Sequence, residues 1–199
     1  DAAYQAYPID RLTNLAKSGA DSVCVSSKYI RGPNSTGFMY GRSDLIASAE
    51  LNGFVAYETP DNRGFEGFGR GFKLDRQEVI ATIIALREWL QLDHEARLRI
   101  QEKRFQVIAE SISGMSHVNM EQGFFKGFPW MSLKVTLDEE DLGITAAEVE
   151  ESLRTGDPSI RVQLGTLDGY EQTIMITTET LHDGEEVIVA RRLREILRA

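Results

Sequence analysis

The sequence predicts an α/β fold that is followed by a small α+β unit. Two observations predict this class. Short apolar runs that favour β-strands alternate with segments whose apolar residues recur at helical spacing. A long helical stretch then separates the first part of the chain from a last third that has its own strands and helices. We therefore expect an α/β part at 1–73, a connecting helix region at 74–113 and a small α+β domain at 114–199, which suits a length of 199 residues.

The first part begins with a predicted helix at 8–18, which Gly19 ends. The run at 22–25 carries no charge and is β-prone, which is typical of a buried parallel strand, so we expect Cys24 to be a small buried side chain. A turn with glycine and proline at 31–37 leads to a second short strand at 38–40. A helix at 45–51 follows, and either Ser43 or Asp44 caps it.

Residues 53–71 have a different composition, rich in glycine and aromatic side chains. A loop of this length inside a compact domain is usually functional or mobile. The alternative is a surface excursion whose aromatic side chains cover a neighbouring core. The residues in question are Gly53, Gly64, Gly67, Gly69, Gly71, Phe54, Tyr57, Phe65 and Phe68, with Phe72 directly after them.

One long helix is predicted from Asp75 to Gly114, with Glu78 completing a capping box. The last third then reads as strand, strand, helix, strand, strand, helix, an order that resembles a split sandwich with helices on one face. Its predicted strands lie at 115–121, 130–137, 159–164 and 172–177, one helix starts at Thr145 with Glu148 in its capping box, and Asp183 and Glu186 cap the last helix.

Composition excludes several classes of protein. The net charge of −9 argues against a nucleic-acid partner, because a phosphate backbone attracts basic surfaces. Eight of the acids lie within 138–157 and indicate a solvated helix face. No apolar stretch is long enough to span a membrane, and the residues from Asp1 onward show no basic and apolar pattern of a signal peptide. With a single cysteine the chain cannot form an internal disulfide, so we expect a cytoplasmic protein.

The residues that point to chemistry lie in the first part. The three histidines show no metal-binding spacing, and no nucleotide-binding motif follows a strand, so we expect no metal. An acid, Asp1, precedes the first helix, and Lys28 follows the next strand. Parallel strands bring such residues together at their carboxyl ends, where ligands bind. A lysine and a carboxylate in this arrangement suit pyridoxal 5′-phosphate (PLP): the lysine forms a Schiff base, and the carboxylate keeps the ring nitrogen protonated.

These segments resemble fold-type-I PLP-dependent enzymes of the group that holds L-seryl-tRNA(Sec) selenium transferase and D-glucosaminate-6-phosphate ammonia-lyase. The resemblance is most specific around Lys28 and runs along most of the chain. The matching segments are Asp1-Ala2-Ala3, Gly19-Ala20-Asp21, Lys28, Arg31 to Gly37, Gly41-Arg42, Gly69-Arg70 with Lys73 and Glu78, Asp157 to Ile160, and Leu181 to Glu185.

The resemblance implies a fold and a site. The chain would be the second half of a fold-type-I PLP-dependent transferase large domain, followed by the small C-terminal domain. A missing N-terminal half of the same protein would supply the phosphate-binding turn, because family members are about twice this length. The implied catalytic residues are Lys28 and Asp1, the cofactor-binding residues are Lys28, Asp1, Ala3, Ser26, Arg31 and Thr36, and the substrate-binding residues are Arg70, Arg161 and Gln163.

Two positions depart from the family pattern. Ser26-Ser27 stands where glycines usually precede the lysine, and Gln163 stands where an arginine often holds a substrate carboxylate. The resemblance implies a small-molecule substrate, a homo-oligomer, and α-deprotonation with β-elimination of the ammonia-lyase type. The alternatives are a selenium transferase acting on aminoacyl-tRNA, an aminotransferase or racemase on the same scaffold, and a catalytically inactive scaffold.

Overall fold

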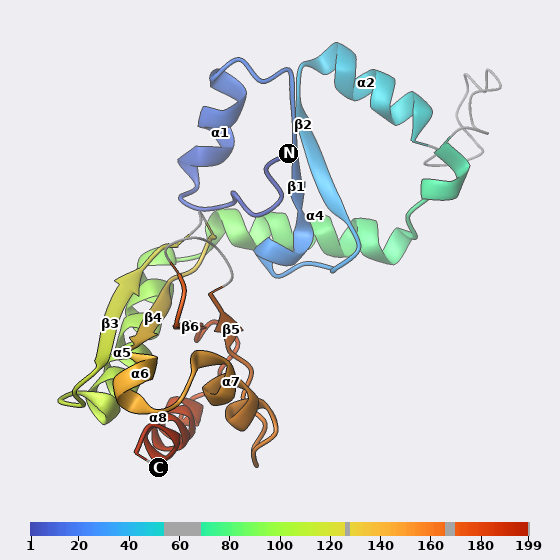
Figure 1. The fold of residues 1–199 in the computed structure, drawn as a ribbon. Helices are drawn as coiled ribbons and strands as arrows, with labels where there is room; N and C mark the ends of the chain where they lie inside the picture. The colour runs from blue at the N-terminus through green and yellow to red at the C-terminus, as the bar shows by residue number, and fades with distance from the viewer. Residues whose placement is uncertain (54–68, 126–127, 166–169, 199) are drawn as a thin grey trace. The chain divides into compact units, whose positions relative to one another are not determined.

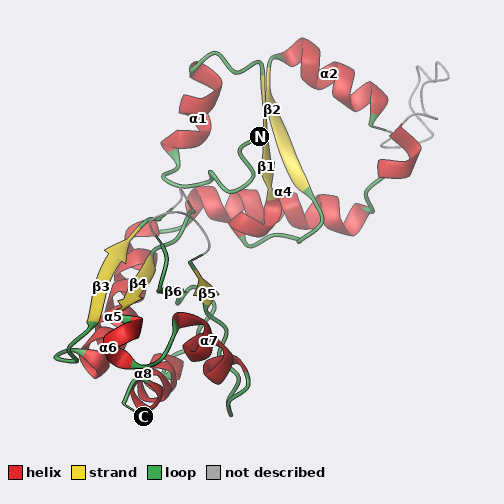
Figure 2. Cartoon of the chain, viewed as in Figure 1, coloured by secondary structure: helices red, strands yellow, loops and turns green. Residues whose placement is uncertain are grey.

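The computed structural model describes residues 1–53, 69–125, 128–165 and 170–198 (Figure 1). The chain divides into two compact units. Unit 1 comprises residues 1–92 with 127–129, and unit 2 comprises residues 93–126 with 130–199. Each unit has helices, a sheet and a hydrophobic core of its own, so the predicted mixed α/β class is confirmed (Figure 2).

The predicted single helix between the two parts is wrong. Two helices replace it, α4 (Arg76–Gln91) in unit 1 and α5 (His94–Ile112) in unit 2. The break has a local cause: Leu92 is extended, and the carboxylate of Asp93 accepts a 2.9 Å hydrogen bond from the Ala96 N–H as the N-cap of α5. At the other end of α4, Asp75 caps the helix as predicted, through a 2.7 Å bond from the Glu78 N–H.

Unit 1 is built around a two-stranded sheet. Strand β1 (Ser22–Ser26) pairs with β2 (Gly37–Gly41) in an antiparallel register from Ser22↔Gly41 to Ser26↔Gly37. The run at 22–25 was expected to be a buried parallel strand, and its pairing with β2 is antiparallel instead. The chain turns back through a short 3₁₀ helix, η1 (Ser27–Ile30), and the Gly-Pro turn, and a turn of this kind can join only antiparallel strands.

Cys24 is exposed, contrary to the expectation of a buried side chain. The cause is alternation along β1: its neighbours Val23 and Val25 face the core, so Cys24 points to the other face of the sheet. The strand is thus covered on one side in the described part of the chain. Besides η1 and α4, the described part of unit 1 has the helices α1 (Asp10–Lys17), α2 (Ser43–Asn52) and the short η2 (Arg70–Phe72). Arg42 is the N-cap of α2, and the predicted caps Ser43 and Asp44 are its first two residues.

In the core of unit 1, α4 packs against the N-terminal segment and against η1, the turn that follows β1. The indole N–H of Trp89 donates a 2.9 Å hydrogen bond to the carbonyl of Ala6. The buried hydroxyls of Ser27 and Thr82 lie 3.0 Å apart in a hydrogen bond. Helix α4 therefore supports the turn that follows β1. The buried apolar residues are Ala2, Ala6, Val23, Val25, Ile30, Ala85 and Trp89.

Unit 2 is a four-stranded antiparallel sheet with helices packed on it. The strands are β3 (Val118–Gly123), β4 (Ser132–Leu137), β5 (Gln163–Leu164) and β6 (Thr173–Ile176), in the spatial order β3-β4-β6-β5. On β4, Leu133, Val135 and Leu137 are buried, whereas Lys134 and Thr136 between them are partly exposed. Helices α5, α7 (Ala146–Arg154) and α8 (Glu185–Ile196) bury their apolar residues in the same core. The predicted order of elements is confirmed here.

Two local predictions in unit 2 need correction. A short helix, α6 (Glu139–Leu142), follows β4 and was not predicted, because four residues are too few to show helical periodicity. The N-cap of α8 is Gly184, in a left-handed conformation with φ 92°, and not Asp183. Asp183 instead accepts a 2.9 Å bond from Arg104. Among the described helices, none is long and apolar enough to cross a membrane.

The predicted capping box of α7 is present, and it makes the stability of unit 2 depend on pH. The backbone N–H and the hydroxyl of Thr145 each donate a 2.8 Å hydrogen bond to the Glu148 carboxylate. These bonds hold the pKa of Glu148 below its ordinary value of 4.5. Because the folded-state pKa is the lower one, this stabilisation is fully present above about pH 4.5 and is lost as the pH falls through the depressed pKa.

We expect Glu148→Gln to reduce the free energy of unfolding at neutral pH and to have a progressively smaller effect as the pH falls below 4.5. Denaturant unfolding at several pH values measures the difference. Glu140→Gln, on exposed α6, is the matched control for the loss of one charge. A difference between Glu148→Gln and the native chain that stays constant down to acid pH would contradict the role of the carboxylate.

Candidate functional site

Lys28 lies on η1, the turn directly after β1. Its neighbours Ser27 and Ile30 are almost fully buried, whereas Lys28 itself is exposed. Backbone bonds close the turn: the Ser27 N–H donates to the Thr36 carbonyl at 3.0 Å, and the Gly32 N–H donates to the Ser27 carbonyl at 2.8 Å. The lysine thus projects from a turn that is fixed to the core on both sides.

The segment that begins with Asp1 runs beside the end of β1. The Ala2 N–H donates to the Cys24 carbonyl at 2.9 Å, and the Ser26 N–H donates to the Ala3 carbonyl at 3.0 Å. Both stretches run in the same direction, so the segment is a parallel neighbour of β1. Asp1 is exposed, and its Oδ1 accepts a 2.9 Å bond from the Ala3 N–H. The acid and the lysine are therefore carried by two adjacent stretches of backbone.

Three aromatic rings pack together between these two stretches of backbone, and they were not predicted from the sequence. The ring centroids of Tyr4 and Tyr29 are 6.0 Å apart, and Phe128 lies 5.0 Å from Tyr4 and 6.2 Å from Tyr29. The Lys28 ammonium lies 5.3 Å from the centroid of the Tyr29 ring, within range of a cation–π attraction. Tyr4 directly follows Ala3 and Tyr29 directly follows Lys28, so the sequence could have indicated that both rings lie near the lysine. Nothing in the spacing indicated Phe128.

The other predicted cofactor residues surround the same turn. Ser26 is half-buried at the end of β1, and Ala3 is half-buried beside it. Arg31 is exposed and ends η1 in a left-handed conformation with φ 67°. Thr36 is only 8% exposed, and its Oγ1 has no hydrogen-bond partner among the described residues. A buried hydroxyl beside the lysine turn is therefore available to a bound group.

The predicted substrate residues are distributed differently. Arg70 begins η2, but its side chain lies outside the described part of the chain, as does most of the 53–71 loop. Gln163 is exposed on β5, where it pairs with Met175. Arg161 lines a cavity of about 280 Å³ in unit 2, together with Thr177, Thr180, Glu185 and apolar side chains. Lys28 belongs to unit 1, so a shared substrate with Arg161 or Gln163 stays a prediction.

The chain has named relatives, although no protein-family model matches it. It is 25% identical over 187 residues to D-glucosaminate-6-phosphate ammonia lyase of Salmonella typhimurium (strain 14028s / SGSC 2262), covering 93% of this chain and 46% of that protein. The predicted resemblance is confirmed. A 5'-C-glycyluridine monooxygenase-decarboxylase of Streptomyces sp is 28% identical over 194 residues, covering 94% of this chain and 43% of the relative.

A solved structure of D-glucosaminate-6-phosphate ammonia-lyase shares the fold. It superposes with a TM-score of 0.68 at 24% sequence identity, over 100% of this chain and 48% of the other. The chain thus spans about half the length of the curated relatives it matches. Both of these relatives are enzymes by name, and one of them is a lyase.

Proposed function

We propose that this chain carries the cofactor lysine of a PLP-dependent enzyme. It would form the second half of a fold-type-I large domain and the small domain that follows. The observation that supports this best is the exposed Lys28 on a rigid turn, with the Asp1–Ala3 stretch hydrogen-bonded along the strand that leads into it. The reaction we favour is α-deprotonation with β-elimination, of the ammonia-lyase type, on a small amino acid or amino-sugar acid.

The residues of the turn fit PLP. Lys28 Nζ would be the point of covalent attachment, and the Asp1 carboxylate would pair with the protonated ring nitrogen. The Thr36 hydroxyl, which is buried without a partner among the described residues, would bind a cofactor oxygen. Ser26 ends β1, Arg31 ends η1, and Ala3 lies on the neighbouring stretch, where its carbonyl accepts from the Ser26 N–H. PLP, when bound, supplies an electron sink for negative charge at the substrate α-carbon.

The protein groups would then bind and move protons. Lys28 Nζ, which lies over the Tyr29 ring, would take the proton from the α-carbon and later deliver it. The Tyr4, Tyr29 and Phe128 rings would limit the access of water on their side of the lysine. Asp1 would keep its own charge and so hold the proton on the ring nitrogen.

Ammonia release distinguishes this proposal from its alternatives. A PLP-loaded protein that contains this chain is incubated with D-glucosaminate-6-phosphate, the substrate in the name of one relative. We expect ammonia and a keto acid in equal amounts. Consumption of O₂ with release of CO₂ from an amino-acid-bearing nucleoside would favour the second relative's reaction instead. A salt-dependent gel shift with tRNA would favour a selenium transferase, which the charge of −9 argues against.

Gln163 predicts a substrate preference. An arginine holds a carboxylate through two charge-assisted bonds, whereas a glutamine amide offers a neutral donor. We therefore expect ordinary α-amino acids to be poor substrates and substrates with a phosphate or second anionic group to be better. Gln163→Arg should raise kcat/KM for plain amino acids, and Arg161→Gln is the comparison that removes the cavity arginine. Efficient turnover of common amino acids by the native protein, unaffected by Arg161→Gln, would contradict this prediction.

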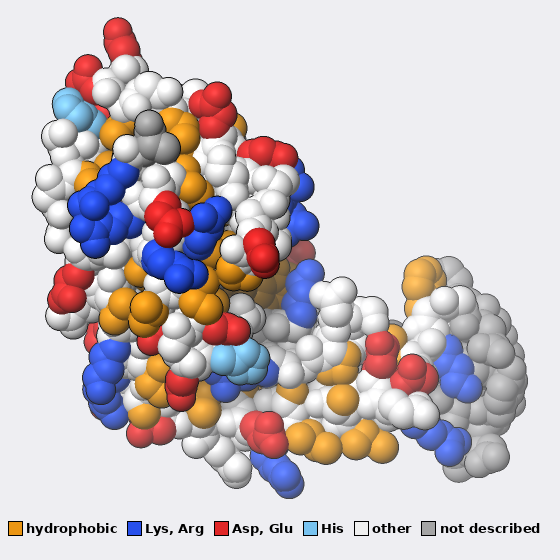
Figure 3. Space-filling model, turned by 90° about the horizontal axis from the view of Figure 1, so that it is seen from below, with side chains coloured by type: hydrophobic (Ala, Val, Ile, Leu, Met, Phe, Trp, Pro, Cys, Tyr) orange, Lys and Arg blue, Asp and Glu red, His pale blue; other side chains and the backbone are white. Residues whose placement is uncertain are grey.

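Self-association is part of the proposal. Helix α4 exposes large apolar side chains, with Ile80 57% and Ile83 63% exposed, and hydrophobic atoms lie open along unit 1 in Figure 3. An exposed apolar surface of this kind is typical of protein–protein contact. Either another part of the same protein or a second copy of it would cover this surface, and the predicted homo-oligomer stays a prediction.

A further inference from the structure

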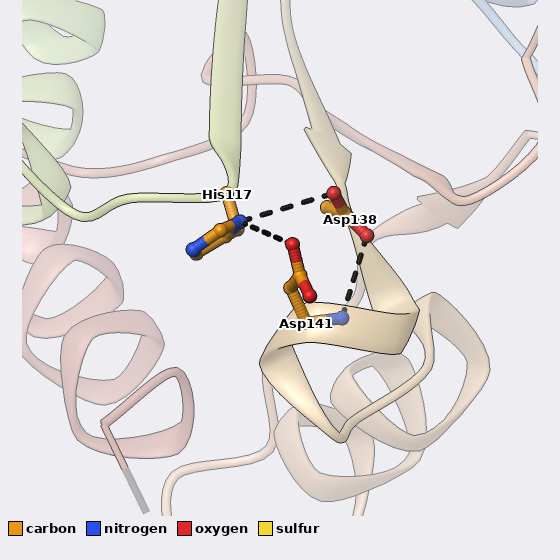
Figure 4. Close-up of side chains that lie close together, drawn as sticks. All are labelled: His117, Asp138 and Asp141. Atoms are coloured by element: carbon orange, nitrogen blue, oxygen red, sulfur yellow. Dashed lines mark hydrogen bonds and ion pairs between the residues drawn. The ribbon is translucent and has the colours of Figure 1, made fainter.

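We propose that unit 2 has a binding site for a divalent transition-metal ion, formed by His117, Asp138 and Asp141. The three side chains point toward one another on the surface of the unit (Figure 4). One ligand atom from each lies within 4.8 Å of the other two. His117 Nδ1 is 3.0 Å from Asp141 Oδ2 and 3.8 Å from Asp138 Oδ2.

The backbone places these three residues before any ion binds. Strands β3 and β4 pair Val118 with Leu137, and the Asp138 N–H continues that ladder with a 2.9 Å bond to the His117 carbonyl. Asp138 is also the N-cap of α6: its Oδ1 accepts from the Asp141 N–H, and its Oδ2 remains directed at His117. The sheet thus joins His117 to Asp138, and the helix turn joins Asp138 to Asp141. Because less conformational freedom has to be lost on binding, such an arrangement favours the ion.

The spacing of the donor atoms suits a transition metal. Metal–nitrogen and metal–oxygen bonds of about 2.1 Å place neighbouring donors about 3.4 Å apart around a tetrahedral ion, the usual geometry of zinc, and about 3.0 Å apart around an octahedral ion. The His117–Asp141 distance of 3.0 Å and the His117–Asp138 distance of 3.8 Å lie on either side of the tetrahedral value. The Asp138 oxygen would have to move closer, and a side-chain rotation can achieve this because 52% of the Asp138 side chain is exposed. Solvent reaches all three residues, so water can complete the coordination.

The donor set selects the class of ion. Two carboxylates give a charge of −2 that a divalent cation neutralises. Imidazole nitrogen is a ligand of zinc, nickel, cobalt and copper, whereas magnesium and calcium prefer oxygen. We therefore infer Zn²⁺ or a similar first-row ion. His117 and Asp138 are far apart in the sequence, and this is why histidine spacing did not reveal the group.

Calorimetric titration of the protein that contains this chain with ZnCl₂ tests this site directly. We expect saturable binding of one ion at this site, with at least a tenfold loss of affinity in His117→Asn and in Asp141→Asn. His117 has φ 71°, a conformation that asparagine tolerates well, so His117→Asn preserves the turn while removing the imidazole. His182→Ala is the matched control, since His182 is exposed elsewhere in unit 2. MgCl₂ should bind much more weakly.

Thermal unfolding provides a second readout. An ion bound only to the native state links the β3–β4 pair to α6 and raises the melting temperature as its concentration increases. We expect this rise in the native chain and in His182→Ala, and we expect it to disappear in His117→Asn. Absence of saturable Zn²⁺ binding up to millimolar concentration, or equal affinity in His117→Asn and the native chain, would overturn the proposal and leave an ion-pair cluster.

Discussion

Lys28→Ala is expected to abolish covalent attachment of PLP and to lower turnover by at least roughly a thousandfold, because the same amine would both hold the cofactor and move the α-proton. In the native protein, borohydride reduction followed by peptide mapping should find the pyridoxyl group on Lys28. Because Lys28 is exposed and its turn is held by Ser27 and Ile30, the variant should remain folded.

Lys17→Ala is the control for this experiment, since Lys17 is an exposed lysine at the end of α1 in the same unit. It should keep the visible absorbance band of the cofactor and full activity. Label on a lysine other than Lys28, or an absorbance band and turnover that survive in Lys28→Ala, would remove Lys28 from the site. The proposed function would lose its main support with it.

Asp1→Asn is expected to leave PLP bound and to slow α-proton exchange by roughly a hundredfold or more. A neutral amide does not hold the ring nitrogen protonated, so the electron sink is weaker. The local backbone should be unchanged, because the amide oxygen of asparagine can still accept the bond from the Ala3 N–H. Loss of the α-proton signal in D₂O, followed by NMR, measures the rate.

Asp10→Asn, which removes one carboxylate from the exposed first turn of α1, is the matched control and should exchange at the native rate. The intact protein is the sample for both variants. An exchange rate in Asp1→Asn equal to that of Asp10→Asn would exclude the carboxylate from the role at the ring nitrogen, while the assignment of Lys28 would stand on its own test.

The elements of the fold were largely predictable because each depends on local pattern. Residues close in sequence determine the helix caps at Asp75 and Thr145 and the alternation of buried and exposed side chains along β4. The direction of strand pairing depends on more distant residues. The run at 22–25 was therefore expected to be a parallel strand, whereas β1 pairs with β2 in antiparallel fashion. The break between α4 and α5 had a local signal in Asp93, but the apolar stripes on both sides hid it.

The residues of the candidate site also fall into those that the local sequence predicts and those that only the fold brings together. Asp1 and Lys28 could be matched because both lie in one continuous stretch, residues 1–28, which also holds α1 and β1. Phe128 could not, since it enters the aromatic cluster from a distant segment and is recognised only once the fold is known. The His117 group likewise depends on the pairing of β3 with β4, which brings together residues that no sequence motif connects.

The glycines of the turn after Lys28 have a consequence for how such proteins are recognised. A Cβ at Gly37 would collide with the Val25 carbonyl oxygen, and one at Gly32 would lie 2.9 Å from the Ser27 Cβ and 3.1 Å from the Ala85 Cβ. Steric exclusion alone therefore constrains these two positions. Selection for folding alone would retain Gly32 and Gly37 even in a descendant that had lost catalysis. In a genome survey, Gly32 and Gly37 would therefore indicate common ancestry. Catalytic activity would have to be judged from whether a lysine is present at position 28 and an acid at position 1.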